Sequence, residues 1–389
     1  MKTESHLIII VGGNHHNGLN LARSLGKNGF LIDCCVITDA NESILQYSKY
    51  TRKCGCFQNE KDAFDWILNH YIDQAEKPVL IPYSDGAAME LDNRLKQFAD
   101  RFYVPSIGGH EGKITFLMNK KNQYDWATQN GIKMASSIEC ELRQDILQPF
   151  EYPIILKPAL SAEGDKGDIC ICENESEFKK EVVSLIEKGY SRTIIQPYLS
   201  IDYEIDVFGC IRRNNPRIML VPTETIRAWP LKKGTNCFSK IIIDEERIDK
   251  CKFIINKLKD CGFYGLYDIE ILVVNGEFFL NEINYRNSGD DYMALSQNYY
   301  YAVAWVNDVL GICEETQALE HPLKATYAMT FNCDIRHVFS HRLGLLKWCK
   351  DCLRTKDFAL KYPGDMRPMW FFYMNKIIKK LRGLCFERK

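Results

Sequence analysis

Two acidic side chains and an amide are predicted to meet across a hairpin near residue 275. Glu270 lies on its first strand, and Glu282 and Asn284 lie two residues apart on its second. Residues two apart on a strand point to the same face, so these oxygens should converge. Charged groups among Ile, Leu and Phe are costly to bury unless a cation neutralises them. Oxygen ligands predict a Mg²⁺ site, with Mn²⁺ as the alternative ion.

Two cationic residues could work beside this site. Arg286 continues the face of Glu282 and Asn284, where a guanidinium suits the negative charge of a phosphoryl transfer or a tetrahedral intermediate. Lys157 ends an apolar strand before a glycine-bearing loop, from which it could reach nucleotide phosphates. Taken alone, Lys157 fits a snorkelling surface residue equally well, and the acids fit an exposed hairpin. The combination, with its strand parity and apolar neighbours, favours a metal and phosphate site.

The elements that must position these residues fall into two regions. The first hundred residues alternate strand and helix signals, which predicts βαβ units around a parallel sheet. Beyond them, strands with interspersed helices predict an α+β region, and Asn275-Gly276 is the strongest hairpin signal. The predicted strands of that region cover residues 152–157, 168–172, 193–196, 203–210, 218–225, 267–274 and 277–283. A helix is expected over residues 114–131, and residues 333–389 are predicted to be helical, basic and rich in aromatics.

Two loops of the first region follow strand ends. Residues 12–18 could cradle a phosphate with backbone amides, but their spacing is not GxGxxG, so a plain strand-to-helix turn is favoured. His15 and His16 in this loop are compatible with either role. Asp85 follows the strand predicted at residues 79–82, where it could cap a helix or contact a ligand. The sequence leaves those two readings open.

The composition of the chain limits the classes of partner and the compartment that can be expected for it. Lys and Arg total 50 against 51 for Asp and Glu, so no nucleic-acid partner is expected. The start has no signal-peptide pattern and no apolar run reaches the roughly 18 residues of a membrane span, so a cytoplasmic protein is expected. The sixteen cysteines are then expected to be reduced. The CxxC and CxC pairs have no second pair at zinc-site spacing.

The order of these motifs resembles that of the ATP-grasp superfamily, whose nucleotide lies between two α+β lobes. The resemblance covers roughly residues 6–310. It implies an α/β plus α+β fold with four parts: an N-terminal parallel α/β pre-ATP-grasp domain (1–112), a central ATP-grasp lobe with a flap (113–200), a C-terminal lobe with the metal site (201–325) and a helical extension (326–389).

The resemblance also implies an ATP site. Lys120 follows Asn119, where the family usually has Asp, and precedes Gly131 by the family's spacing of eleven residues. Gln196 stands where an acid is usual in the adenine-binding hinge, and Glu204 falls where the family's ribose carboxylate lies. The implied nucleotide-binding residues are Lys120, Lys157, Gln196, Pro197, Leu199, Glu204 and the flap residues Ser161, Gly164 and Gly167. Glu270, Glu282, Asn284 and Arg286 match the family's metal and transition-state set.

A further segment points to substrates. Residues 222–240 resemble an R-x-x-P-x-x-x-G segment of D-aspartate-ligase-like members and of carboxylate–amine ligases from polysaccharide loci. Arg227 is therefore expected to act with Arg286, holding the transferred phosphate or a substrate carboxylate. Lys232 and Lys233 could bind the same groups, although solvation of the loop is the favoured role for them. The implied reaction joins a small-molecule carboxylate to an amine through an acyl phosphate, releasing ADP and phosphate, on an amino acid or a polysaccharide or peptidoglycan precursor.

Alternatives remain for the reaction and the tail. Residues 287–289 are similar to the NSG text of carboxyaminoimidazole ribonucleotide synthases, so a carboxylase using bicarbonate is the second hypothesis. A nucleotide-binding module without turnover is the third, and the full metal set argues against it. The tail is expected to pack on the body; aromatic residues 369–374 and basic residues 375–389 also permit an interfacial helix at a membrane. A homodimer is left open.

Overall fold

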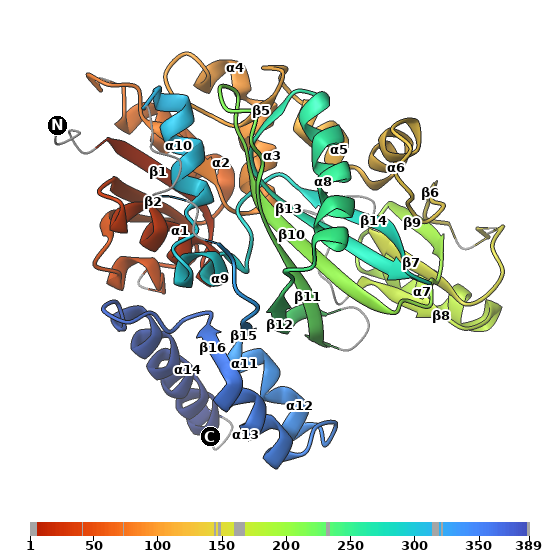
Figure 1. The fold of residues 1–389 in the computed structure, drawn as a ribbon. Coiled ribbons are helices and arrows are strands. Elements are labelled where there is room, and N and C mark those ends of the chain that lie inside the picture. The colour runs from red at the N-terminus through yellow and green to blue at the C-terminus, as the bar shows by residue number, and fades with distance from the viewer. Residues whose placement is uncertain are drawn as a thin grey trace.

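Three β-sheets organise the chain in the computed structural model (Figure 1). The structure describes residues 6–40, 42–72, 74–143, 145–146, 149–158, 168–230, 234–312, 319 and 322–386. The α/β plus α+β organisation predicted from the sequence is confirmed. No helix in this described part is both long and apolar enough to cross a membrane.

The N-terminal region is a parallel sheet with the strand order β3-β2-β1-β4. Strands β1, β2 and β4 are apolar and buried at their centres, as expected for a parallel sheet covered by helices, whereas the edge strand β3 is partly exposed. Its elements are β1 (Leu7–Gly13), α1 (His16–Lys27), β2 (Leu31–Ile37), η1 (Leu45–Tyr47), β3 (Thr51–Phe57), α2 (Glu60–His70), β4 (Val79–Pro82), α3 (Asp85–Asn93) and α4 (Leu95–Phe98). The carboxyl ends of β1 and β4 meet at one edge, which brings both loops singled out in the sequence together.

A small antiparallel sheet follows, in the order β6-β9-β7-β8. The helix predicted over residues 114–131 is divided at Asn119, whose backbone is extended and whose side chain caps the second helix. The elements are β5 (Ser106–Ile107), α5 (Lys113–Met118), α6 (Lys120–Gln129), β6 (Ile138–Glu141), β7 (Ile154–Pro158), β8 (Cys170–Cys172), α7 (Glu175–Glu187) and β9 (Arg192–Pro197). The break places Lys120 at the start of a helix.

The largest sheet has the order β14-β13-β10-β11-β12-β15-β16, with β5 paired to β13. Asn275 and Gly276 both have positive φ, 52° and 75°, which suits the predicted two-residue hairpin between β13 and β14. The elements are β10 (Tyr203–Ile211), β11 (Met219–Trp229), β12 (Thr235–Ile241), α8 (Glu245–Asp260), β13 (Phe263–Val274), β14 (Glu277–Asn284), α9 (Asp291–Ser296) and α10 (Tyr301–Leu310).

The C-terminal segment extends this sheet and then becomes mainly helical. Its elements are β15 (Tyr327–Met329), α11 (Phe331–Asp334), α12 (Arg336–Phe339), α13 (Leu345–Arg354), β16 (Thr355–Phe358) and α14 (Arg367–Phe386). The ring of Phe371 stacks on Tyr47 of η1, and the buried Arg23 of α1 pairs with Asp365 at 2.8 Å. The tail therefore packs on the body, which was the favoured prediction from its sequence.

Candidate functional site

A cavity of about 990 Å³ lies where the three sheets meet. The small sheet lines one side with Lys157 and Gln196, and the large sheet lines another with Glu270 and Glu282. The N-terminal region closes the far end through the loops that follow β1 and β4. The cavity therefore has a wall from every sheet.

The predicted metal set lies together in this cavity. Glu270 and Glu282 are direct cross-strand neighbours, and Asn284 lies opposite Asp268. A β-bulge makes this possible: Glu270 pairs with Glu282 while Ile271 pairs with Leu280, so Asn281 is the extra residue. Leu280 and Ile283 consequently share one apolar core although they are three residues apart. The side chains of Asn281 and Glu282, which lie between them, and of Asn284, which follows them, thereby line the cavity.

Two further carboxylates join the set and were not predicted. Asp206 of β10 lies opposite Glu270 of β13, and Asp268 also lines the cavity. Burial, and then the charges of Glu270 and Asp268, raise the pKa of Asp206 well above its usual range. The signal was present in the sequence, because Asp206 follows Glu204, and Asp268 precedes Glu270, at the two-residue spacing of one strand face.

This donor set fits a divalent cation. Buried carboxylates that repel one another are stabilised when a cation lies among them, and oxygen ligands suit Mg²⁺. Asn284 lines the cavity, and its Nδ2 atom is buried without a hydrogen-bond partner among the described residues. A buried donor of this kind is normally satisfied, so a polar ligand is expected beside it.

Two buried lysines face these acids. Lys120 Nζ lies 3.7 Å from Glu282 Oε1, and Lys157 lines the same cavity. Burial, and then the charge of Lys120, lower the pKa of Lys157 to about 8, although Glu282 and Glu270 oppose the shift. Two cations pointing at one space are suited to the oxygens of a polyphosphate.

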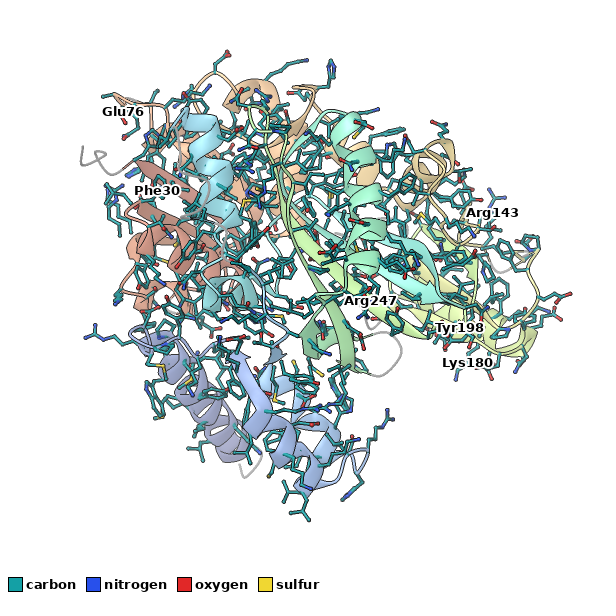
Figure 2. The ribbon with its side chains drawn as sticks, viewed as in Figure 1. Phe30, Glu76, Arg143, Lys180, Tyr198 and Arg247 are labelled. Atoms are coloured by element: carbon teal, nitrogen blue, oxygen red, sulfur yellow. The ribbon has the colours of Figure 1, made fainter. Side chains whose placement is uncertain are left out.

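The hinge residues form the opposite wall. Gln196, Pro197, Tyr198 and Leu199 line the cavity at the end of β9, and Tyr198 is labelled in Figure 2. The Gln196 side-chain amide donates a hydrogen bond to the Ser137 hydroxyl, and this bond fixes the orientation of the amide. Glu204 of β10 lines the cavity from the large sheet.

Arg286 is held between two acids at the far end of the cavity. Its guanidinium pairs with Asp268 and lies 3.2 Å from Asp85. Burial alone would lower the pKa of Arg286, but Asp85 and Asp268 raise it. Asp85 does not cap α3, because the Ser84 side chain does so, and its carboxylate is a contact of the arginine instead. One of the two readings of Asp85 is thereby removed.

The loop after β1 contributes uncharged groups. His15 and His16 line the cavity with their rings 3.8 Å apart, and the His15 side chain caps α1. Burial, and then the charge of Arg286, lower the pKa of His15 to about 4. Burial lowers the pKa of His16 as well. Both imidazoles are therefore neutral near pH 7 and suited to hydrogen bonding.

The structure corrects the role expected of Arg227. Its guanidinium donates to Asp334 through two nitrogens, each at 2.8 Å, and to Asp351 at 2.6 Å. Arg227 is absent from the described wall of the cavity. The reason is an irregularity in pairing: Thr225 faces Ser239 while Arg227 faces Phe238, so the two are turned to opposite faces of β11. Thr225 contacts Asp206, and Arg227 anchors the C-terminal helices.

Arg227→Met is expected to lower the free energy of unfolding by about 3–5 kcal/mol, because it leaves the buried Asp334 without its cation and Asp351 with only the partly exposed Arg354. Chemical denaturation measures this loss. The control is Arg247→Met, whose partner Glu224 is about one third exposed, with an expected loss below about 1 kcal/mol. Unchanged stability with lost turnover would restore a catalytic role to Arg227.

Some predicted residues lie outside the described part of the chain. These are the flap residues Ser161, Gly164 and Gly167, and the loop lysines Lys232 and Lys233. The CxxC and CxC cysteines are free thiols. A buried group of Cys237, Asp334 and His337 has metal-like spacing, but Arg227 and Trp348 already bind the Asp334 carboxylate.

Two ligases are among the curated proteins to which the chain is similar. No protein-family model matches it. The D-alanine–D-alanine ligase of Campylobacter concisus is 27% identical over 227 residues, covering 54% of this chain and 62% of the relative. The D-aspartate ligase of Enterococcus faecium is 24% identical over 235 residues, covering 56% and 55%. The chain thus spans less than two thirds of the length of these relatives.

Solved structures support the fold. N5-carboxyaminoimidazole synthetase from Staphylococcus aureus, complexed with ADP, has a TM-score of 0.64 at 18% identity and covers 84% of this chain and 82% of its own. L-amino acid ligase from Bacillus licheniformis has a TM-score of 0.63 at 12% identity and covers 84% and 80%. At such identities the likeness concerns the fold alone, and chemistry must be argued from the site.

Proposed function

Because this chain belongs to the ATP-grasp superfamily, we propose that it is an ATP-dependent ligase that joins a carboxylate to an amine. One observation carries the proposal: Glu270, Glu282 and Asn284 share a cavity with the buried Lys120 and Lys157. Carboxylate and amide oxygens facing two cations suit a metal-bound polyphosphate. The D-alanine–D-alanine ligase and the D-aspartate ligase that the chain resembles are, by their names, ligases of amino acids, which supports the proposal.

The proposed division of labour follows the walls of the cavity. Lys120 and Lys157 bind phosphate oxygens, residues 196–199 bind the adenine, and Glu204 binds the ribose. Glu270, Glu282 and Asn284 would hold Mg²⁺, which when bound neutralises charge on the phosphates. Arg286, fixed by Asp85 and Asp268, stabilises the oxyanion formed when the amine attacks the acyl phosphate. This route requires positioning and charge neutralisation, with no covalent nucleophile from the protein.

The carboxylase alternative depended on the NSG text at residues 287–289. Asn287 is fully buried; its side-chain nitrogen donates to Asn17 Oδ1, and its side-chain oxygen accepts from the Tyr301 hydroxyl. These contacts join the large sheet to the N-terminal region, which gives the asparagine a structural reason to be present. The Asn-Ser-Gly sequence therefore favours neither the ligase nor the carboxylase reaction. Dependence of phosphate release on bicarbonate would distinguish the two.

A phosphate-release screen tests the proposed function. Purified protein and MgATP are combined with amino acids, uronic acids and peptides, as acid and amine in pairs. We expect phosphate release that requires both partners, with an amide product in the mass spectrum. Release that requires bicarbonate would favour the carboxylase. Failure of every acceptor, bicarbonate included, would contradict an enzyme of either kind.

Nucleotide affinity is expected to fall as pH rises above about 8, by up to about tenfold per pH unit. The pKa of Lys157 is about 8 in the free protein, and bound phosphates would raise it. Below pH 8 the lysine is already charged, so affinity changes little there; above it, binding must take up a proton. Titration calorimetry in two buffers of different ionisation enthalpy measures that proton. Lys157→Met should bind weakly and show no proton uptake, and uptake that persists in this variant would contradict the assignment.

A further inference from the structure

The C-terminal extension separates its charges by burial. Between residues 326 and 381 the chain has eleven lysines and arginines against four aspartates. All four aspartates are buried: Asp334, Asp351, Asp357 and Asp365. All eleven cations are exposed: Arg336, Arg342, Lys347, Lys350, Arg354, Lys356, Lys361, Arg367, Lys376, Lys379 and Lys380. The outer surface of the extension is therefore cationic, although the whole chain is nearly neutral.

Ion pairs with arginines of the body explain why three of these aspartates are buried. Asp334 and Asp351 bind Arg227 of the large sheet, and Asp365 binds Arg23 of the N-terminal region. They attach the extension to the body and leave little negative charge to offset the lysines outside. Packing of the extension thus accounts for these acids. Among its cations, Arg354 pairs with Asp351 and Lys379 pairs with Glu42, whereas the others have no ion pair among the described residues.

Apolar side chains are exposed among these cations. One face of α14 packs on the body through Phe371 and its neighbours. The other face exposes a stripe at helical spacing: Trp370, Met374, Ile377, Ile378 and Leu381. In α13, Leu346 and Leu353 are 81% and 87% exposed. Figure 1 shows these blue helices gathered at one end of the molecule, apart from the lobe that carries β8 and α7.

We propose that this surface, made by the exposed faces of α12, α13 and α14, docks on an anionic lipid membrane. Exposed aliphatic and tryptophan side chains flanked by lysines are suited to the boundary between headgroups and acyl chains. Each basic residue near an anionic surface adds to the attraction. The chain would lie on the membrane and not cross it, and its cavity is on another part of the molecule.

Other occupants fit less well. A second copy of the chain would bring eleven exposed cations against eleven, which like-charge repulsion opposes. A nucleic acid would satisfy the charges but would leave aliphatic side chains such as Leu346, Leu353 and Ile377 without apolar contacts. A lipid surface supplies both an anionic layer and an apolar one.

Vesicle flotation of the full chain tests the proposal. We expect binding to vesicles of phosphatidylglycerol with phosphatidylcholine, weak binding to phosphatidylcholine alone, and release at high salt. Lys347→Glu, Lys350→Glu and Lys380→Glu together should weaken binding by about a hundredfold, because each cation near such a surface contributes about fivefold. The matched control carries Lys53→Glu, Lys180→Glu and Lys250→Glu, which change three exposed lysines elsewhere.

The apolar stripe is tested separately. Trp370→Ser with Leu381→Ser should weaken vesicle binding by roughly tenfold or more, whereas Ile72→Ser with Phe253→Ser, two exposed apolar residues elsewhere, should not. Circular dichroism confirms that each variant is folded. Equal binding by the test and control variants would overturn the proposal, as would binding to RNA or self-association without vesicle binding.

Discussion

Glu282→Gln is expected to lower kcat by about a thousandfold or more while the protein stays folded. Glu282 lies beside Glu270 across the hairpin and within 3.7 Å of Lys120. Glutamine keeps the shape of the side chain but removes the charge that would hold a divalent cation. The loss should therefore appear in turnover, measured as phosphate release at saturating MgATP with the acceptors found in the screen.

The same strand offers a matched control. Glu277 lies on β14 but is exposed and pairs with Lys133 on the surface, at 2.6 Å. Glu277→Gln should leave kcat within about twofold, because an exposed ion pair contributes little. Wild-type turnover in Glu282→Gln, with equal binding of Mg²⁺, would remove the metal assignment. Loss of activity in both variants would indicate damage to the hairpin.

Arg286→Lys is expected to lower kcat by about a hundredfold or more with a smaller change in nucleotide affinity. The substitution keeps the positive charge between Asp85 and Asp268 but removes the planar fork that contacts both. A group that acts on the transition state should lower kcat, whereas a purely structural one should lower the unfolding temperature. Steady-state kinetics and thermal unfolding separate the two.

Arg247→Lys is the control for this exchange. Arg247 of α8, labelled in Figure 2, also pairs with a carboxylate, Glu224, but both side chains are about one third exposed. Its exchange should leave kcat unchanged. If Arg286→Lys turns over normally, the oxyanion must be stabilised by other groups.

Local sequence determined most of the candidate site. Asn275-Gly276 predicted the hairpin because both residues tolerate positive φ, and the two-residue spacing of Glu282 and Asn284 predicted a shared face. Lys157 and Gln196 could be placed because each ends an apolar strand. Such signals work because backbone conformation and side-chain direction along one strand depend on neighbours in the chain.

Contacts between segments that are distant in the sequence were decided only by the tertiary structure. The bulge at Asn281 and the irregular pairing at Arg227 determine the face of the sheet on which the neighbouring side chains lie. Both depend on the register of each strand with its partner strand. Asp206 meets Glu270 because β10 pairs with β13, more than fifty residues later. Burial of all four C-terminal aspartates depends on partners such as Arg23 and Arg227, so the cationic surface exists only in the folded chain. These contacts form between segments that are far apart in the sequence, so a local sequence pattern does not predict them.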